Sequence, residues 1–286
     1  MLKIGTIDIA LPRVNKLVDI YARRPTYDYL YWNIIRAILA ENGVSNPTLI
    51  DVGANIGDTI AHFRRFSTGP AIGVEPDDEY FDLLAQNMSP VANVTAIKAL
   101  VCPDNLMGDV SLMVKNGTGG TVVTQGAGTY HGPTLSVGAL LARTSGPLVF
   151  KTDTDGFDQV ILGDLLAEMR GGHPLIDIIA FEGPTQQQMG ESDYNDFLTV
   201  VEKICALGYR IIMLSNVGAP LAYPMSDFEQ IRWQMNALTR NLAAGIAATP
   251  YFDFIAVRPD LSSDCLQLTD TTIWTDIHPP SASTTA

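Results

Sequence analysis

Short apolar segments alternate with helix-like segments over most of the chain beyond residue 47. The apolar segments read TLIDV, AIGVE, VTAIKALV, PLVFKTD, IDIIAFE, YRIIML and FDFIAV. Each has the length of a buried strand, and the segments between them, such as DEYFDLLAQNM, have the apolar spacing of an amphipathic helix. Strands that alternate with helices form a mainly parallel sheet covered on both faces. The sequence therefore predicts an α/β fold.

Three regions are expected along the chain. Residues 1–46 contain amphipathic helical pieces, VNKLVDIYARR and YDYLYWNIIRAILAENG, with Gly43 as a C-terminal stop. Residues 47–260 form the α/β domain, and residues 261–286 form a loose polar tail. Residues 105–133, rich in Gly and Thr, predict a β-hairpin excursion or a mobile loop. An aromatic set in the N-terminal extension either lines a pocket or, more ordinarily, packs this helical cap on the domain: Tyr27, Tyr29, Tyr31 and Trp32.

The amino-acid composition indicates which kinds of binding partner are expected. The formal net charge is −13, from 31 acidic and 18 basic residues, which argues against a broad surface for nucleic acid or anionic membranes. No apolar run approaches the ~18 residues of a membrane span. The three cysteines are far apart and suggest neither a disulfide framework nor a zinc site. We expect a cytoplasmic protein with a small or neutral substrate.

The most informative motif is the glycine turn in LIDVGANIGDT. A strand runs through this turn into a helix, and Gly53 and Gly57 would let the backbone approach a ligand where a Cβ would collide with it. About twenty residues further on, Glu75 ends the next strand, where a carboxylate accepts the hydroxyls of a ribose in nucleoside-binding folds. The plain alternative is a tight connection between strand and helix.

Two residues, one in the turn and one just before it, indicate which nucleoside-containing ligand would bind there. A dinucleotide fingerprint needs a glycine where Asn55 stands, and Asp51 places an acid just before the turn. Both features disfavour a diphosphate and favour S-adenosylmethionine, which carries no phosphate and has a cationic sulfonium. The predicted cofactor-binding residues are Asp51, Gly53, Ala54, Asn55, Gly57, Glu75 and Pro76.

At this point the sequence resembles the FkbM-type S-adenosylmethionine-dependent methyltransferases. The resemblance covers roughly residues 48–215, and its most specific block is KTDTDG, from Lys151 to Gly156. It implies a Rossmann-like class I methyltransferase fold, with a mostly parallel seven-stranded sheet whose last strand is antiparallel. It also implies methylation of a sugar or polyketide hydroxyl. The chain departs from the family at Asp155, where Glu is usual, and at Ser136, where a Leu-Asp pair is usual.

Carboxylates also follow two further predicted strands. Asp153 and Asp155 end LVFKTDTD, and Glu182 ends IDIIAFE. If these strands are neighbours, the acids converge as a general base or, for Asp153 and Glu182, as ligands of Mg²⁺. In the plain alternative, Asp155 caps the following helix and Asp153 orders the turn. His131, in the glycine-rich segment, is a candidate base or substrate contact.

These patterns predict an S-adenosylmethionine-dependent O-methyltransferase acting on a sugar or another small-molecule or glycan acceptor. The catalytic candidates are Asp153, Asp155, Glu182 and His131. A homo-oligomer is compatible with the sequence. Two alternatives stay open: an NAD-dependent oxidoreductase on the same topology, and a non-catalytic nucleoside-binding module.

Overall fold

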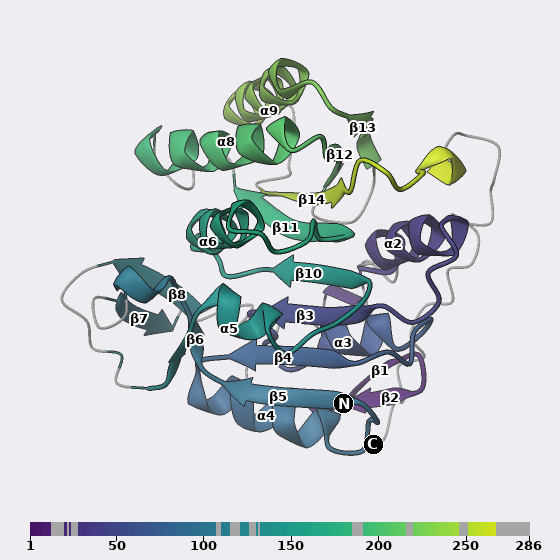
Figure 1. The fold of residues 1–286 in the computed structure, drawn as a ribbon. Coiled ribbons are helices and arrows are strands. Elements are labelled where there is room, and N and C mark those ends of the chain that lie inside the picture. The colour runs from purple at the N-terminus through teal and green to yellow at the C-terminus, as the bar shows by residue number, and fades with distance from the viewer. Residues whose placement is uncertain are drawn as a thin grey trace.

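The computed structural model describes residues 1–12, 20–21, 23, 28–106, 110–114, 121–125, 130, 132–184, 191–215, 220–245 and 251–266. Figure 1 shows a central sheet flanked by helices. The strands are β1 (Leu2–Ile4), β2 (Ile7–Ile9), β3 (Thr48–Val52), β4 (Ala71–Glu75), β5 (Val94–Lys98), β6 (Leu100–Val101), β7 (Val110–Val114), β8 (Thr121–Gln125), β9 (Thr134–Leu135), β10 (Leu148–Thr152), β11 (Ile178–Pro184), β12 (Arg210–Ser215), β13 (Pro220–Met225) and β14 (Tyr251–Val257). The helices are α2 (Tyr29–Glu41), α3 (Asp58–Phe63), α4 (Asp78–Met88), α5 (Val137–Leu141), α6 (Asp158–Arg170), α8 (Glu191–Ala206) and α9 (Phe228–Ala243).

The main sheet has eight strands in the order β13-β12-β14-β11-β10-β3-β4-β5. The neighbouring pairs from β5 to β11 are parallel, whereas β14 is antiparallel to both β11 and β12. Numbered along the chain, the parallel part follows the doubly wound order 3-2-1-4-5, with its switch point between β3 and β10. The α/β Rossmann-like fold is confirmed, and its last strand is antiparallel as expected.

The expected count of seven strands is wrong by one edge strand. β13 pairs back on β12 in antiparallel register, with irregularities in the ladder. Its sequence PLAYPM contains two prolines, which lack the N–H that an inner strand must donate. An edge position tolerates these prolines. They also interrupt the apolar pattern, which is why the sequence did not predict this strand.

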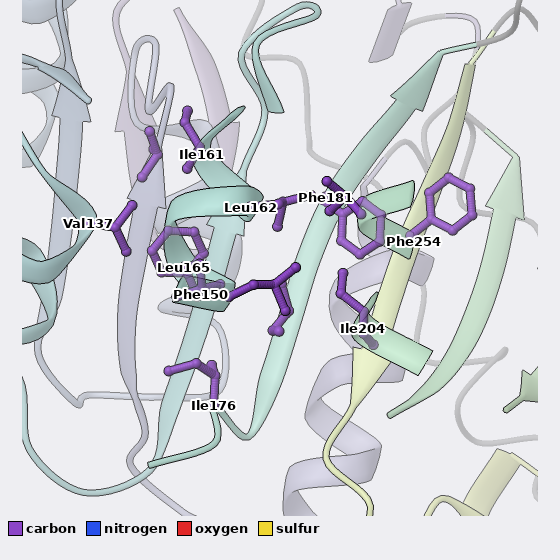
Figure 2. Close-up of a cluster of buried hydrophobic side chains, with 14 of the residues drawn as sticks. Val137, Phe150, Ile161, Leu162, Leu165, Ile176, Phe181, Ile204 and Phe254 are labelled. Carbon is purple, nitrogen blue, oxygen red and sulfur yellow. The ribbon is translucent and has the colours of Figure 1, made fainter. Parts of the chain in front are cut away.

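Helices bury both faces of the sheet. On one face, α5, α6, α8 and α9 contribute side chains to the larger core cluster, which includes Phe150 of β10. Figure 2 shows part of this core, in which Phe181 of β11 lies beside Phe254 of β14. These two rings stack with centroids 5.0 Å apart and planes 7° from parallel. On the other face, α2, α3 and α4 cover positions such as Leu49, Val149 and Ile178.

The N-terminal region differs from the helical extension that the sequence predicts. Residues Leu2–Ile4 and Ile7–Ile9 form an antiparallel hairpin, and most of VNKLVDIYARR lies outside the described residues. Helix α2 ends as expected before Gly43, which has a left-handed φ of 70°. The division at residue 46 stays a prediction, although side chains from both sides of it share one core cluster.

The aromatic residues of α2 are packing residues. Trp32 is 1% exposed and contacts the rings of Phe63 and Phe66 from the segment of α3, with centroids 6.1 and 6.3 Å away. Tyr29 and Tyr31 are buried as well, whereas Tyr27 lies outside the described residues. Three of the four aromatic residues are therefore buried, as expected if this face of the helix packs on the domain.

Residues near the two ends of the chain bond to each other directly. The Asn42 side chain donates to the carbonyl of Ser262 at 2.8 Å and accepts from the Ser262 N–H at 2.8 Å. The Ser262 hydroxyl donates to Glu41 at 2.6 Å. These bonds attach the end of α2 to the segment that follows β14.

The glycine-rich region contains the hairpin that the sequence predicts. β7 and β8 form a separate two-stranded antiparallel sheet, which Figure 1 shows beside the main sheet near β6. The expected loose tail lies outside the described residues from residue 267 onward. Among the helices that the structure describes, none has the length and apolar character needed to cross a bilayer.

The buried aromatic face of α2 gives a test of its place in the core. Replacing Trp32, 1% exposed, with Ala should lower the free energy of unfolding by about 3–5 kcal/mol, because it leaves a cavity between α2 and α3. Trp233→Ala is the matched control, since Trp233 is 70% exposed and should change stability little. Urea unfolding of both variants measures the difference. Equal effects would show that α2 is not part of the cooperative core.

Candidate functional site

The glycine turn lies at the carboxyl end of β3, beside the switch point of the sheet. The N–H groups of Gly53 and Ala54 both donate to the carbonyl of Val74, at 3.0 Å each. Gly53, Asn55 and Gly57 have positive φ angles of 79°, 47° and 88°. The turn is therefore held against β4 by its own backbone, at the place where α/β sheets bind ligands.

The structure gives reasons for the two glycines within the protein itself. A Cβ on Gly53 would lie 2.1 Å from the carbonyl oxygen of Asp153, at the end of the neighbouring strand. A Cβ on Gly57 would lie 3.0 Å from side-chain atoms of Leu84 and Met88 on α4. The carbonyl of Asp153 requires a glycine at residue 53, and the left-handed φ of 88° favours one at residue 57. The expected close approach of a ligand to these glycines stays a prediction. A Gly53→Val variant would fail by misfolding and would not test ligand binding.

Glu75 joins the tip of β4 to the turn. Its two carboxylate oxygens accept separate backbone N–H groups, from Asn55 and from Asp77, at 3.0 Å each. The residue is 3% exposed, and burial raises the pKa of its carboxyl to about 7, although these two bonds oppose the shift. Each oxygen keeps a second lone pair, so the carboxylate can still accept the two hydroxyls of a ribose. Ala54 is buried beside it and Pro76 is half-buried.

Asp51 and Lys151 form a buried charged pair in the middle of the sheet. The two residues are register partners on β3 and β10, and Lys151 Nζ lies 3.7 Å from Asp51 Oδ1. Asp51 is fully buried, and neither of its oxygens has a hydrogen-bond partner within the described residues. Burial raises the pKa of Asp51 to about 7, while Lys151 lowers it. Asp51 at the base of the turn therefore has an ion pair with Lys151 but no hydrogen bond within the described residues.

Lys151 is the residue that links the turn to the acids beyond it. Its Nζ bonds Asp153 Oδ2 at 2.9 Å. Burial lowers the pKa of Lys151, but the carboxylates of Asp153 and Asp51 outweigh it and hold the pKa well above its usual value. The sequence analysis assigned no role to Lys151. The available signal was a lysine inside an apolar strand, since buried lysines are nearly always paired.

The acids predicted at the next strand ends do converge. β10 and β11 are parallel neighbours, which places Asp153 and Glu182 at one sheet edge. Glu182 also lies directly opposite Asp253 in the antiparallel register of β11 and β14. Burial raises the pKa of Glu182 well above its usual value, and the charges of Asp153 and Asp253 raise it further. Asp253 is therefore a site residue that the sequence analysis missed.

Asp155 does not cap α6. The helix begins at Asp158, its N-cap residue is Phe157, and no side chain caps it. Instead Asp158 accepts the Thr152 hydroxyl at 2.8 Å and the Thr154 N–H at 3.2 Å, which ties the helix start to the strand end. Asp155 stands in a left-handed conformation with φ 52° and adds negative charge near Glu182. Asp153 orders no turn through its side chain but pairs with Lys151.

The N-terminal segment adds two polar groups to the same place. Asp28, half-buried with a φ of 61°, precedes α2. Burial raises its pKa well above the usual value, and the charges of Asp58, Asp253 and Asp153 add to the shift, while Lys151 opposes it. Tyr31 is 5% exposed, and burial raises its pKa too, with Lys151 opposing. Tyr31 is thus a packing residue, and a pocket lined by the aromatic set stays a prediction.

The described residues do not fit a metal site. They contain no group of three or more His, Cys, Asp or Glu placed to hold one ion, and the Asp153 carboxylate already binds Lys151. The expected Mg²⁺ ligation by Asp153 and Glu182 thus stays a prediction without supporting geometry.

The histidines offer no base within the described site. His131 lies outside the described residues. His62 is buried on α3, where its Nε2 lies 2.8 Å from the Tyr21 hydroxyl. Burial lowers its pKa well below the usual value, with Arg65 adding to the effect, so this ring is a neutral packing group.

Comparison with solved structures finds similarity to several methyltransferases at low sequence identity. An O-methyltransferase from Bacillus cereus in complex with SAH is 11% identical, with 84% of this chain and 87% of that chain covered and a TM-score of 0.41. A precorrin-6y C5,15-methyltransferase from Geobacter metallireducens is 13% identical, with 78% and 87% covered and a TM-score of 0.38. Fibrillarin from Aeropyrum pernix with bound S-adenosyl-L-methionine is 10% identical, with 79% and 76% covered and a TM-score of 0.38. No family model and no curated protein matches the chain. Likeness at these levels concerns the fold and assigns no activity.

The unbonded Asp51 carboxylate predicts a pH-dependent stability. Its folded pKa of about 7 lies above the usual 3.8, so the folded state holds a proton that the unfolded state releases between these values. The parent protein should therefore lose stability relative to Asp51→Asn as pH rises from 4 to 7. The difference should be near zero at pH 4 and on the order of 4 kcal/mol above pH 7.

Urea unfolding at several pH values measures this difference. Asp196→Asn is the matched control, because Asp196 is an exposed aspartate on α8. The difference in free energy of unfolding between the parent and Asp51→Asn could instead stay constant across the pH range. That result would show that the pKa of Asp51 is the same in the folded and unfolded states.

Proposed function

We propose that this chain is an S-adenosylmethionine-dependent O-methyltransferase. The observation that carries the proposal is the pairing of Glu75 with the turn at the switch point, with the unbonded Asp51 carboxylate at the base of the same turn. A ribose can donate two hydroxyls to Glu75, and a cationic ligand compensates Asp51. A ligand with a diphosphate would instead meet several uncompensated carboxylates, which disfavours the NAD-dependent alternative.

The residues fit the cofactor's chemistry at both ends. When bound, S-adenosylmethionine supplies a methyl group on a sulfonium, and an acceptor oxygen displaces the sulfur from it in line. Glu75 would hold the ribose, and the turn with Asp51 would hold the amino-acid end. The fixed turn orients these groups before the acceptor arrives, which is a main source of rate in a two-substrate reaction.

The acceptor hydroxyl must lose its proton as the new C–O bond forms. Glu182 and Asp253 are the groups suited to accept it, because their carboxylates lie at the sheet edge and burial raises the pKa of each. For Asp253 the value is about 7, which suits a general base at neutral pH. Lys151 forms an ion pair with Asp153 beside them. This division of roles needs no metal ion.

The finer assignments are also part of the proposal. Membership of the FkbM type rests on the resemblance of the block from Lys151 to Gly156, and the sugar or glycan hydroxyl follows from that resemblance. The buried pair of Lys151 with Asp51 and Asp153 gives that block a physical reason, since it joins the turn to the acids. A non-catalytic nucleoside-binding module would need the turn but not the acids at β11 and β14.

The assignment of Glu75 to the ribose predicts that replacing this residue lowers the affinity for the cofactor. Glu75→Ala should weaken S-adenosylmethionine binding by about 1–3 kcal/mol, roughly fivefold to 150-fold, because hydrogen bonds to a charged group are lost. Isothermal calorimetry measures the affinity, with NAD as the competing ligand. Glu79→Ala, an exposed glutamate on α4, is the matched control.

Three outcomes are informative. Unchanged affinity in a folded Glu75→Ala protein would remove the ribose assignment. Tighter binding of NAD than of S-adenosylmethionine by the parent would favour the oxidoreductase. Cofactor binding with no methyl transfer to any hydroxyl acceptor would favour the non-catalytic module.

A further inference from the structure

Asn87 is a buried amide on α4 that the proposed reaction does not use, and the residue is only 4% exposed. Its oxygen accepts the Ala10 N–H at 2.7 Å. Its nitrogen donates to two carbonyls, that of Ala10 at 3.1 Å and that of Ile56 at 2.8 Å. The side chain therefore joins three parts of the chain, which are the segment after β2, helix α4 and the glycine turn.

The Ile56 carbonyl belongs to the second half of the glycine turn. Strand β4 holds the first half, through the Val74 carbonyl and the Glu75 carboxylate. The second half leads away from β4 into α3, which begins at Asp58. The bond from Asn87 attaches this second half to α4. The turn is thus held by hydrogen bonds from two separate elements.

The backbone on both sides of Ile56 is in the left-handed region. Asn55 has a φ of 47° and Gly57 a φ of 88°. Such conformations persist where the surrounding structure fixes them. The N–H of Asn55 also bonds Glu75, the residue proposed to hold the ribose. The bond from Asn87 to the Ile56 carbonyl therefore fixes the turn one residue away from the proposed ribose contact.

The two bonds with Ala10 fix the orientation of the Asn87 amide. The Ala10 N–H takes the amide oxygen, so the amide nitrogen is directed to the carbonyls. An amide has both a donor and an acceptor, whereas an ionised carboxylate of the same shape has acceptors only. Ala10 directly follows β2, and Ile9 of β2 is fully buried in the same core cluster as Ile56. The anchor of the amide is therefore part of the packed structure.

We propose that Asn87 is a positioning residue of the cofactor site, which braces the glycine turn on the N-terminal hairpin formed by β1 and β2. Groups that bind a ligand keep their geometry when neighbouring residues hold them in place. The hairpin acts through Asn87 and the turn, and not by contact with the ligand. The inference rests on the proposed function for the identity of the ligand, whereas the bracing of the turn rests on the hydrogen bonds alone.

Asn42 provides a matched control with the same bonding pattern. Its amide exchanges two hydrogen bonds with the backbone of Ser262, both at 2.8 Å, and donates to the carbonyl of Ile38 at 2.7 Å. These bonds involve no residue of the glycine turn. Asn42→Ala therefore removes an equivalent bridge from another part of the fold.

Amide hydrogen exchange in the ligand-free protein tests the bracing directly. Asn87→Ala should speed exchange at the turn, residues 53–57, by about threefold to tenfold more than at β11, which is the scale of one lost hydrogen bond. Asn42→Ala should change the turn and β11 by the same factor. Equal acceleration at the turn and at β11 in Asn87→Ala would overturn the proposal, because the amide would then contribute only to global stability.

A second variant leaves Asn87 and the core in place. Ala10→Pro removes the N–H that the Asn87 oxygen accepts, and the preceding residue is in a strand, a conformation that a following proline tolerates. Exchange at the turn should rise relative to β11 in this variant too. It tests the brace even if Asn87→Ala does not fold. An unchanged ratio in folded Ala10→Pro would overturn the part assigned to the hairpin.

Calorimetry with S-adenosylhomocysteine tests the consequence for the cofactor site. Asn87→Ala and Ala10→Pro should each weaken binding by about threefold to tenfold, while Asn42→Ala should change it less than about twofold. Unchanged affinity in either of the first two variants, or an equal loss in Asn42→Ala, would overturn the proposal. If the parent does not bind S-adenosylhomocysteine, the proposed function fails, and the exchange measurement still decides whether Asn87 braces the turn.

Discussion

The close approach of the glycine turn to the end of β10 is the constraint on which the site depends. The space for a Cβ at residue 53 is taken by the carbonyl oxygen of Asp153. The Asp153 N–H in turn donates to the carbonyl of Val52 at 3.0 Å, so the ends of β3 and β10 are held in contact on both sides of the switch point. This contact fixes the distance between the glycine turn and the acids at the end of β10. Two reactants bound at these places would meet in one geometry without further movement of the sheet.

This arrangement buries several carboxyl groups, and the burial of their charge is energetically unfavourable. Asp51, Glu75 and Asp253 are carboxylates whose pKa is raised to about 7 by burial, with one buried lysine nearby. A structural ion-pair network of this kind is usually completed by additional donors, because uncompensated buried charge destabilises a fold. For Asp51, no hydrogen bond within the described residues supplies this compensation, and the ion pair with Lys151 is its nearest cationic contact there.

The sequence predicted the features that are local. Buried parallel strands read as apolar runs, and a glycine turn after such a run with an acid about twenty residues later marks the switch point, so both were found. β13 was missed because its prolines break the apolar pattern. The hairpin of residues 2–9 was missed because each strand has only three residues. Asp28 and Asp253 were missed because nothing local distinguishes them, and only the pairing of β11 with β14 and the position of α2 bring them to the site. The contact of Gly53 with the Asp153 carbonyl was missed for the same reason, since the two residues are 100 positions apart in the chain.

The bonds between Asn42 and Ser262 have a consequence for how the protein is made. Helix α2 is formed early in the chain, and these bonds attach it to the residues that follow β14, the last described strand. Contacts of such long sequence separation form late, because a large loop must close before they stabilise the chain. A nascent chain that has not yet released β14 from the ribosome can form the glycine turn but cannot attach α2 to the segment after β14. This attachment therefore waits until the last described strand of the sheet has been made.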